Sequence, residues 1–360
     1  MKRPLMMIAC ILLMLAAGAA SAETVAGLPL HVEKYETGAI RVWVGDHVST
    51  TSIVAFPTDK GVVVVDNTGV PALDRELRKV IARELCRDDF AVLINTHEHG
   101  DHTNGNIVYA DCTIVGHDLL AEGMKRNLEW RDRGIEWRTA RTAEIEEELA
   151  ALEPDAEGYA ALKEQQVWNR LNLEALEANE KQAYPTKTFA DHKVMKMGDT
   201  DVELYYIGGM HSSSDIAILV PKHGLLMTGD TMADVWLTET AGCLASFVAR
   251  DGVEHDFPLL LENWHTLQKR HDDYAVLLPG HWNGTLSYEG FAKRVDYVET
   301  MWVAAEKAAD DDMKLDDFMA ANQFADRFPE LVDSPGCNAG NHYTTMVQMY
   351  SETTGMESAA

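Results

Sequence analysis

The chain has 360 residues, enough for one large domain or two ordinary ones, and its 58 acidic residues outnumber 31 basic ones, giving a formal net charge of −27 at pH 7. A surface this negative repels phosphate backbones, so nucleic acid is not an expected partner and a nuclease is disfavoured. We expect the acidity to serve solubility.

The N-terminus has the layout of a secretory signal peptide. Two basic residues precede an apolar run over residues 5–17, and Ala20-Ser21-Ala22 follows that run. This order predicts removal of residues 1–22, with cleavage after Ala22. An uncleaved membrane anchor is the alternative, because the apolar run is nearly long enough to span a bilayer. We therefore expect an exported protein, periplasmic or secreted, that is soluble after cleavage.

The first part of the mature chain reads as short strands followed by a helix. Apolar or alternating runs at 39–44, 52–56 and 61–66 predict strands. Apolar residues at helical spacing predict an amphipathic helix over 71–85 that packs on the sheet. A further apolar run at 91–95 predicts a buried strand, and 113–116 predicts another. Strands that alternate with helices indicate an α/β arrangement.

The predicted strand at 91–95 runs into four potential metal ligands, His97, His99, Asp101 and His102. If the strand continued, His97 and His99 would point to the same side and could converge on one ion. Asp101 and His102 would follow where the chain turns, and could face a second ion. Imidazole and carboxylate together suit zinc and neighbouring first-row metals.

Residues 118–182 differ from the rest in composition. They lack β-branched runs and are rich in Glu, Ala, Leu and Arg, which predicts two or three helices with a break near Glu153-Pro154-Asp155. This helical insertion stands between the first ligand cluster and later candidate ligands. It is expected either to cover the site as a lid or to pack on the flank of the domain.

After the insertion the strand pattern returns. Strands are predicted at 193–197, 202–207, 216–220, 224–230 and 274–278, with a helix over 257–267 and a mostly helical tail from 288 to 352. His211 lies in a Gly- and Ser-rich loop, and Asp230 and His281 each follow an apolar strand. Each of the three would mean little alone.

Together, the His-x-His-x-Asp-His cluster of residues 97–102 and the later His211, Asp230 and His281 resemble the metallo-β-lactamase superfamily. The resemblance covers most of residues 29–285, apart from the insertion. It implies an α/β (α+β) fold, a four-layer αββα sandwich. It also implies a catalytic domain at 23–285, with the insertion at 118–182 and a C-terminal helical extension at 286–360.

The resemblance also assigns roles to residues. The first metal would be held by His97, His99 and His211, the second by Asp101, His102 and His281, and Asp230 would bridge both. Two Zn²⁺ ions are expected, with iron or manganese possible. Asp66, which closes the run at 61–66, would lie behind the ligands and order their loop by hydrogen bonds.

The implied activity is an exported dinuclear zinc hydrolase that uses a metal-bridging hydroxide to cleave a small-molecule ester, thioester, lactone or lactam. Asp101 could also pass a proton to the leaving group. His99 stands where the redox diiron branch has Glu, and Asp230 stands where zinc β-lactamases usually have Cys or Ser. A mononuclear iron enzyme similar to the persulfide dioxygenases, and a true β-lactamase, remain alternatives. Trp236 and Asn283 follow ligands closely and could line the substrate pocket, although Trp236 fits the core equally well.

Four cysteines would remain after cleavage: Cys86, Cys112, Cys243 and Cys337. An even count in an oxidising compartment permits disulfides, with three possible pairings. Cys86 and Cys112 flank the strand that leads to the ligand cluster, so a disulfide between them is one hypothesis. The sequence gives no indication of the oligomeric state.

Overall fold

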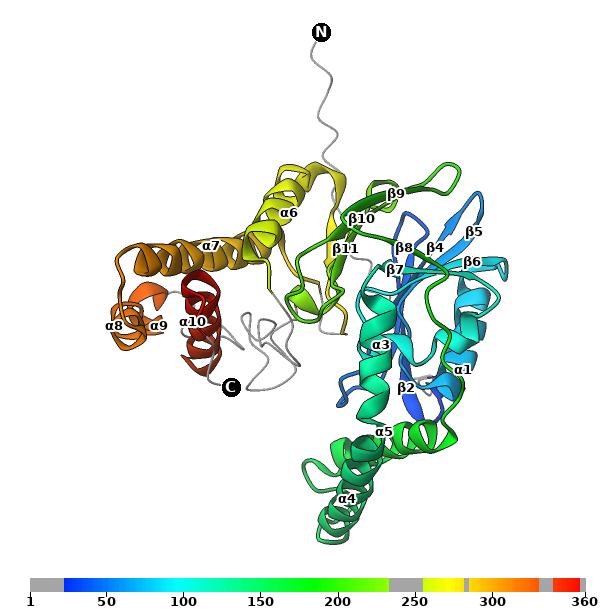
Figure 1. Cartoon of the computed structure of the whole chain (residues 1–360). Coiled ribbons are helices and arrows are strands. Elements are labelled where there is room, and N and C mark those ends of the chain that lie inside the picture. Colours follow the sequence, from blue (N-terminus) through cyan, green and yellow to red (C-terminus); the bar gives the residue numbers. More distant parts are fainter. Residues whose placement is uncertain (1–22, 233–254, 282–284, 330–338, 357–360) are drawn as a thin grey trace.

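Two β-sheets lie against each other, with helices on their outer faces (Figure 1). The computed structural model describes residues 23–232, 255–281, 285–329 and 339–356. No helix in these ranges combines the length and the apolar character that a bilayer crossing needs. The predicted signal segment, residues 1–22, lies outside the described residues.

The first sheet follows the chain order β1 to β8. Its strands from β1 to β5 are antiparallel, and β5 to β8 are parallel. Parallel neighbours need a crossover, and α1 (Pro71–Leu85) supplies the one from β5 to β6. The strands are β1 (Thr24–Val25), β2 (Leu28–Lys34), β3 (Ile40–Val44), β4 (Ile53–Thr58), β5 (Gly61–Val65), β6 (Phe90–Ile94), β7 (Thr113–His117) and β8 (Lys187–Phe189).

The second sheet has the order β13-β12-β11-β10-β9. Its neighbours are antiparallel except β12 and β13, which are parallel and connected through a segment that includes α6 (Phe257–Lys269). The strands are β9 (His192–Lys196), β10 (Asp201–Tyr206), β11 (Ile216–Val220), β12 (Leu225–Met227) and β13 (Val276–Leu278).

Three apolar layers hold this arrangement together. One lies between the sheets and contains Phe56 and Val63 from the first sheet and Ile218 from the second. Another packs α1 on the outer face of the first sheet, and the third packs α6 and the C-terminal helices on the outer face of the second. Burial of one face of each helix and of both inner sheet faces drives this layering. The predicted αββα sandwich is confirmed.

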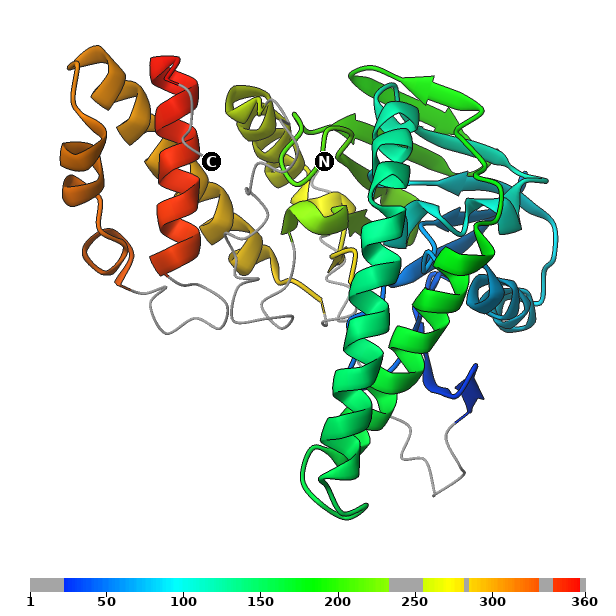
Figure 2. The same ribbon diagram turned by 60° about the horizontal axis from the view of Figure 1, so that its bottom comes forward.

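The insertion forms three helices, α3 (Leu120–Glu129), α4 (Arg131–Ala150) and α5 (Tyr159–Ala178). The predicted break near residues 153–155 falls between α4 and α5. These two long helices pack side by side and project beyond the sheets (Figures 1 and 2). The insertion therefore enters the fold between β7 and β8 without interrupting the sheet order.

The C-terminal helices share their apolar core with the second sheet and α6. Phe291 of α7 and Met346 of α10 belong to the same buried cluster as Leu219 of β11 and Trp264 of α6. The extension thus thickens the outer helical layer of the second sheet. Its helices are α7 (Tyr288–Asp310), α8 (Leu315–Ala321), α9 (Phe324–Arg327) and α10 (Ala339–Thr354).

The proposed disulfide between Cys86 and Cys112 is wrong, because both residues are free. Cys86 is the exposed residue that ends α1 in a left-handed conformation, with φ 53°. Cys112 is buried, and its Sγ lies 3.5 Å from the carbonyl oxygen of Phe90. Sγ of Cys86 lies 3.6 Å from the carbonyl oxygen of Arg83, so each thiol contacts a different backbone carbonyl. Cys243 and Cys337 lie outside the described residues.

Candidate metal centre

Loops at one edge of the two sheets bring all seven predicted ligands together. The expected strand geometry for the first cluster is wrong: β6 ends at Ile94, and His97 and His99 lie in the loop that follows it. Asp101 and His102 lie in the short helix α2 (Gly100–Thr103). The loop and the helix turn, rather than strand alternation, therefore direct these side chains inward. The remaining ligands, which come from elements far away in the sequence, are His211, Asp230 and His281.

One group of donor atoms consists of His97, His99 and His211, whose ring nitrogens lie within 4.8 Å of one another. The closest pair is Nε2 of His211 and Nδ1 of His99, 2.9 Å apart. His211 follows β10 in a loop that the side chain of Asp215 organises. That carboxylate accepts hydrogen bonds from the backbone N–H groups of residues 210, 211 and 212 at 2.6–2.8 Å.

A second group consists of Asp101, His102 and His281. Oδ2 of Asp101 lies 3.7 Å from Nε2 of His102 and 3.5 Å from Nε2 of His281. Asp101 has 46% of its side chain exposed, whereas His102 is fully buried. The group therefore has a buried side and an open side, and Asp101 stands on the open one.

Asp230 lies between the two groups. Its Oδ2 is 3.1 Å from Nε2 of His281 and 3.5 Å from Nε2 of His211. Its Oδ1 is 3.6 Å from Nε2 of His102. Asp230 belongs to the 3₁₀ turn Gly229–Met232, beyond the end of β12 at Met227, and not to the strand as expected. One carboxylate thus faces histidines of both groups.

The site fits divalent metal. The Nε2 atoms of His97 and His102 are buried and have no hydrogen-bond partner among the described residues. Leaving such atoms unpaired costs free energy, which a coordinated cation recovers. Imidazole nitrogens and carboxylate oxygens are also the ligands preferred by zinc and related first-row ions. The types of donor atom and the unpaired buried nitrogens therefore both favour a bound divalent metal ion.

The electrostatics favour the ligating protonation states at His97 and Asp230. At His102 and His281 burial lowers the pKa, but the carboxylates of Asp230 and Asp101 outweigh it and raise the pKa of both rings. Burial and the neighbouring His102 lower the pKa of His97 well below its ordinary value, which keeps this imidazole neutral. Burial opposes the charge of Asp230, but His281 and His102 hold the pKa of that carboxyl well below its ordinary value. Neutral imidazole and ionised carboxylate are the ligating forms.

Asp66 lies directly behind the ligand loop. Its Oδ2 accepts a hydrogen bond from Oγ1 of Thr96 at 2.7 Å and lies 2.9 Å from Nδ1 of His102. Its Oδ1 accepts from the Thr96 backbone N–H at 2.8 Å. These contacts leave Nε2 of His102 directed at the site. Asp66 itself follows β5 in a left-handed conformation, with φ 60°.

Glu98 is a buried carboxylate that sequence reasoning did not single out. It accepts hydrogen bonds from the backbone N–H and hydroxyl of Ser213 and of Ser214, and Arg126 lies 3.5 Å away. Glu98 thereby connects the loop of His97 and His99 to the loop that carries His211. The sequence did contain a signal for this contact: Glu98 stands between His97 and His99, and a run of serines follows His211.

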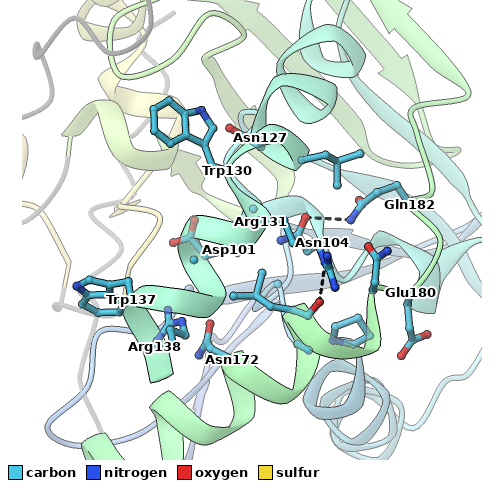
Figure 3. Close-up of a pocket in the computed structure, with 18 of the residues that line it drawn as sticks. Asp101, Asn104, Asn127, Trp130, Arg131, Trp137, Arg138, Asn172, Glu180 and Gln182 are labelled. Atoms are coloured by element: carbon cyan, nitrogen blue, oxygen red, sulfur yellow. Dashed lines mark hydrogen bonds between the residues drawn. The ribbon is translucent and has the colours of Figure 1, made fainter. Parts of the chain in front are cut away.

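A cavity of about 500 Å³ opens beside Asp101 and His281 (Figure 3). Most of its wall comes from the insertion, including Trp130, Trp137 and Arg138. Residues of the insertion therefore border the cavity together with Asp101 and His281. Trp236 and Asn283, which the sequence suggested for this pocket, lie outside the described residues.

Hydrogen bonds that are wholly or partly buried anchor this wall. On α5, the Glu164 carboxylate accepts from the backbone N–H groups of His47 and Val48, at 2.6 and 3.0 Å. Also on α5, the Asn169 side-chain amide donates to the carbonyl oxygen of Arg138 at 2.8 Å. The first contact ties the insertion to the loop after β3, and the second ties α5 to α4. These hydrogen bonds therefore hold the helices that line the pocket in place.

Comparison with known proteins identifies the family. The model of the metallo-β-lactamase superfamily matches residues 44–281, well over half of the chain. A search of curated proteins found no match. Similar solved structures include a metallo-β-lactamase from Pontibacter korlensis, which is 17% identical with a TM-score of 0.47 and covers 75% of this chain and 99% of its own. TMB-1 is 15% identical with a TM-score of 0.48, and the match covers 75% of this chain and 97% of TMB-1. The DIM-1 metallo-β-lactamase is 14% identical with a TM-score of 0.48, and the match covers 76% of this chain and 99% of DIM-1. By its family match, the chain belongs to the metallo-β-lactamase superfamily.

Proposed function

We propose that this protein is a metal-dependent hydrolase that works with two divalent ions, zinc foremost, and cleaves an ester, thioester, lactone or lactam. The observation that carries the proposal is the position of Asp230 between two groups of donor atoms. A single group would support one ion. Two groups that meet at a shared carboxylate support a pair.

The ligand roles follow from the grouping. His97, His99 and His211 would hold one ion, and Asp101, His102 and His281 the other, with Asp230 shared. Ions held there would lower the pKa of water toward neutrality and polarise the carbonyl group of a substrate.

Asp101 is the residue best placed to handle protons. It lines the cavity, and 46% of its side chain is exposed, so a substrate entering the pocket meets this carboxylate. The ionised carboxylate can accept the proton that the attacking water loses, and can then pass that proton to the leaving group as the bond breaks. We therefore assign proton delivery to Asp101 in addition to ligation.

The test combines metal analysis with substrate turnover. The purified protein is expected to hold two zinc ions per chain and to hydrolyse at least one of a panel of chromogenic esters, thioesters, lactones and lactams. Asp101→Ala is expected to abolish hydrolysis while the circular dichroism spectrum stays unchanged. Asp272→Ala is the matched control, because the Asp272 side chain is 93% exposed and belongs to neither group of donor atoms.

Two outcomes would contradict the proposal. Full activity of Asp101→Ala would eliminate the two-metal mechanism. One iron per chain, with oxygen consumption in the presence of a persulfide, would favour the mononuclear oxygenase instead.

We also propose that the protein is exported, on the strength of the order of charged, apolar and small residues in 1–22. N-terminal sequencing after expression in a host with a secretion pathway is expected to read from Glu23. A mature protein that begins at Met1 would contradict export by cleavage.

A further inference from the structure

The cavity beside the metal centre has an aromatic wall supplied by the insertion. Trp130 is 46% exposed and Trp137 is 59% exposed, whereas Trp264 in the core is 1% exposed. Both exposed rings line the cavity together with Trp168. Large aromatic side chains left open in a concave site are typical of ligand contact, because they offer apolar area at low entropic cost.

The same wall contains a cation that has no carboxylate partner among the described residues. Arg138 lies beside Trp137 on α4, and its guanidinium carbon is 5.2 Å from the centre of the Trp137 ring (Figure 3). Its Nη1 donates to Oδ1 of Asn169 at 3.2 Å. No ion pair of Arg138 is found in the part of the chain that the structure describes.

The other charged groups of the wall are already engaged. Arg131 lies 3.0 Å from Asp132 and donates to the carbonyl oxygen of Leu176. Glu180 is paired with Arg75 through both of its oxygens. Arg138 is therefore the wall cation that remains available to a ligand.

The surroundings of Arg138 favour an anionic ligand. Burial lowers the pKa of Arg138, although the nearby Asp101 opposes this effect. A partly desolvated guanidinium gains more from a carboxylate than an exposed one does, since the two can form charge-assisted hydrogen bonds. The protein as a whole carries a net charge of −27, which repels anions. The positive charge of Arg138 therefore provides a local attraction for an anionic ligand in this wall.

We propose that this pocket binds the non-reacting part of the substrate, a carboxylate carried on an aromatic or branched apolar group. Arg138 binds the carboxylate, and Trp130 and Trp137 pack against the apolar group. The bond to be cleaved then lies toward Asp101 and His281, which border the same cavity. The cavity, about 500 Å³, accommodates a small molecule of this kind. The proposal rests on the hydrolase function proposed above, and names its substrate class.

The experiment uses paired substrates on the metal-loaded protein. Each member of the chromogenic panel carries a 3-phenylglutaryl group, once with its second carboxylate free and once with that carboxylate converted to the methylamide. The wild-type protein is expected to prefer the carboxylate form in kcat/KM. Arg138→Gln is expected to reduce the carboxylate-to-amide ratio at least tenfold, and Arg138→Lys to retain part of it.

Arg170→Gln is the matched control. It removes the same charge from the insertion, but Arg170 is exposed, pairs with Glu174 and does not line the cavity. Its carboxylate-to-amide ratio is expected to equal that of the wild type. An equal loss of preference in Arg170→Gln and Arg138→Gln would show a general charge effect and would overturn the proposal.

A binding measurement separates this proposal from the hydrolase function. Tryptophan fluorescence is titrated with 3-phenylglutarate and with its bis-methylamide, neither of which has a bond to be cleaved. Wild type is expected to bind the dicarboxylate more tightly, with an affinity at least tenfold weaker in Arg138→Gln. If the wild type hydrolyses the substrates without preferring the carboxylate form, and if wild type and Arg138→Gln bind 3-phenylglutarate equally well, the assignment of the pocket to a carboxylate is overturned and the hydrolase function stands. Absence of hydrolysis across the panel, with Arg138-dependent binding intact, would overturn only the hydrolase function.

Discussion

The Asp66 carboxylate lies 2.9 Å from Nδ1 of His102 and accepts two hydrogen bonds from Thr96, one from the backbone and one from the hydroxyl. A single buried side chain thereby fixes both the start of the ligand loop and the orientation of a ligand ring. Metal-binding histidines depend on such partners, because the contact at one ring nitrogen sets the tautomer and aims the other nitrogen.

Asp66→Asn is expected to weaken metal binding about 10- to 100-fold without unfolding the protein. Asn keeps the shape of the side chain and tolerates the left-handed backbone at this position, where φ is 60°. Competition with a zinc-binding dye measures the affinity. Asp46→Asn serves as control, since Asp46 is an exposed residue that contacts His31. Equal affinity in Asp66→Asn and wild type would show that Asp66 does not support the site.

Glu98→Gln is expected to lower the free energy of unfolding by about 2 kcal/mol at pH 7, because four hydrogen bonds from Ser213 and Ser214 lose their charged acceptor. Although burial opposes ionisation, hydrogen bonds from Ser214 and its neighbours lower the pKa of Glu98. Because the pKa of Glu98 is lower in the folded than in the unfolded state, its ionised form stabilises the fold at pH values above the unfolded-state pKa. This stabilisation is lost as the pH falls through the folded-state pKa. The difference from wild type should therefore shrink at acid pH.

Urea unfolding at pH 7 and under acid conditions measures this difference. Glu122→Gln is the control, because Glu122 is an exposed neighbour of Arg126 on α3. A difference that grows as the pH falls would contradict the assigned role of Glu98.

Gly280→Ala is expected to damage the metal centre while the fold persists. A Cβ at this position would lie 2.1 Å from Oδ1 of Asp230 and 3.1 Å from Cε1 of His102. Since a shift of about 1 Å in a reacting group costs about 100-fold in rate, hydrolysis should fall by at least that factor. Metal content by mass spectrometry should drop as well. Gly290→Ala on α7 should retain both, and unchanged metal content in Gly280→Ala would contradict the crowded geometry around Asp230.

Asp74→Asn is expected to flatten the pH dependence of stability. Burial raises the pKa of Asp74 to about 7, although hydrogen bonds from Thr68 oppose the shift. The Oδ2 atom of Asp74 has no hydrogen-bond partner among the described residues. Because the pKa of Asp74 is higher in the folded than in the unfolded state, this carboxyl contributes stability at pH values below its unfolded-state pKa. That contribution, on the order of 4 kcal/mol, is lost as the pH rises through the folded-state pKa.

Unfolding free energies at pH 5 and pH 8 test this expectation. The wild type should lose stability toward pH 8, and Asp74→Asn should lose much less. Asp88→Asn, at an exposed position just after α1, should follow the wild type. A variant of Asp74 that keeps the wild-type slope would show that this carboxyl does not change its protonation in that range.

Sequence periodicity predicted most of the secondary structure because it depends on local contacts. The helix expected over 71–85 is α1 with the same bounds, since apolar residues at helical spacing bury one face on the sheet. The strand expected at 61–66 is β5, Gly61–Val65, which is buried along its whole length. Strand ends were less predictable: β6 and β12 stop before His97 and Asp230. There, contacts to other loops determine the backbone.

The sequence by itself determined the donor chemistry of this protein, because residue types and the close spacing of His97 to His102 are properties of the chain. Tertiary structure decided the rest. It placed Asp230 between two groups of donor atoms, gave Glu98 its serine partners and left Cys86 and Cys112 as free thiols. It also turned a charged helical insertion into a pocket wall with Arg138 beside Trp137. These relationships join segments distant in sequence, and only the packing of the two sheets and their helices sets the distances between them.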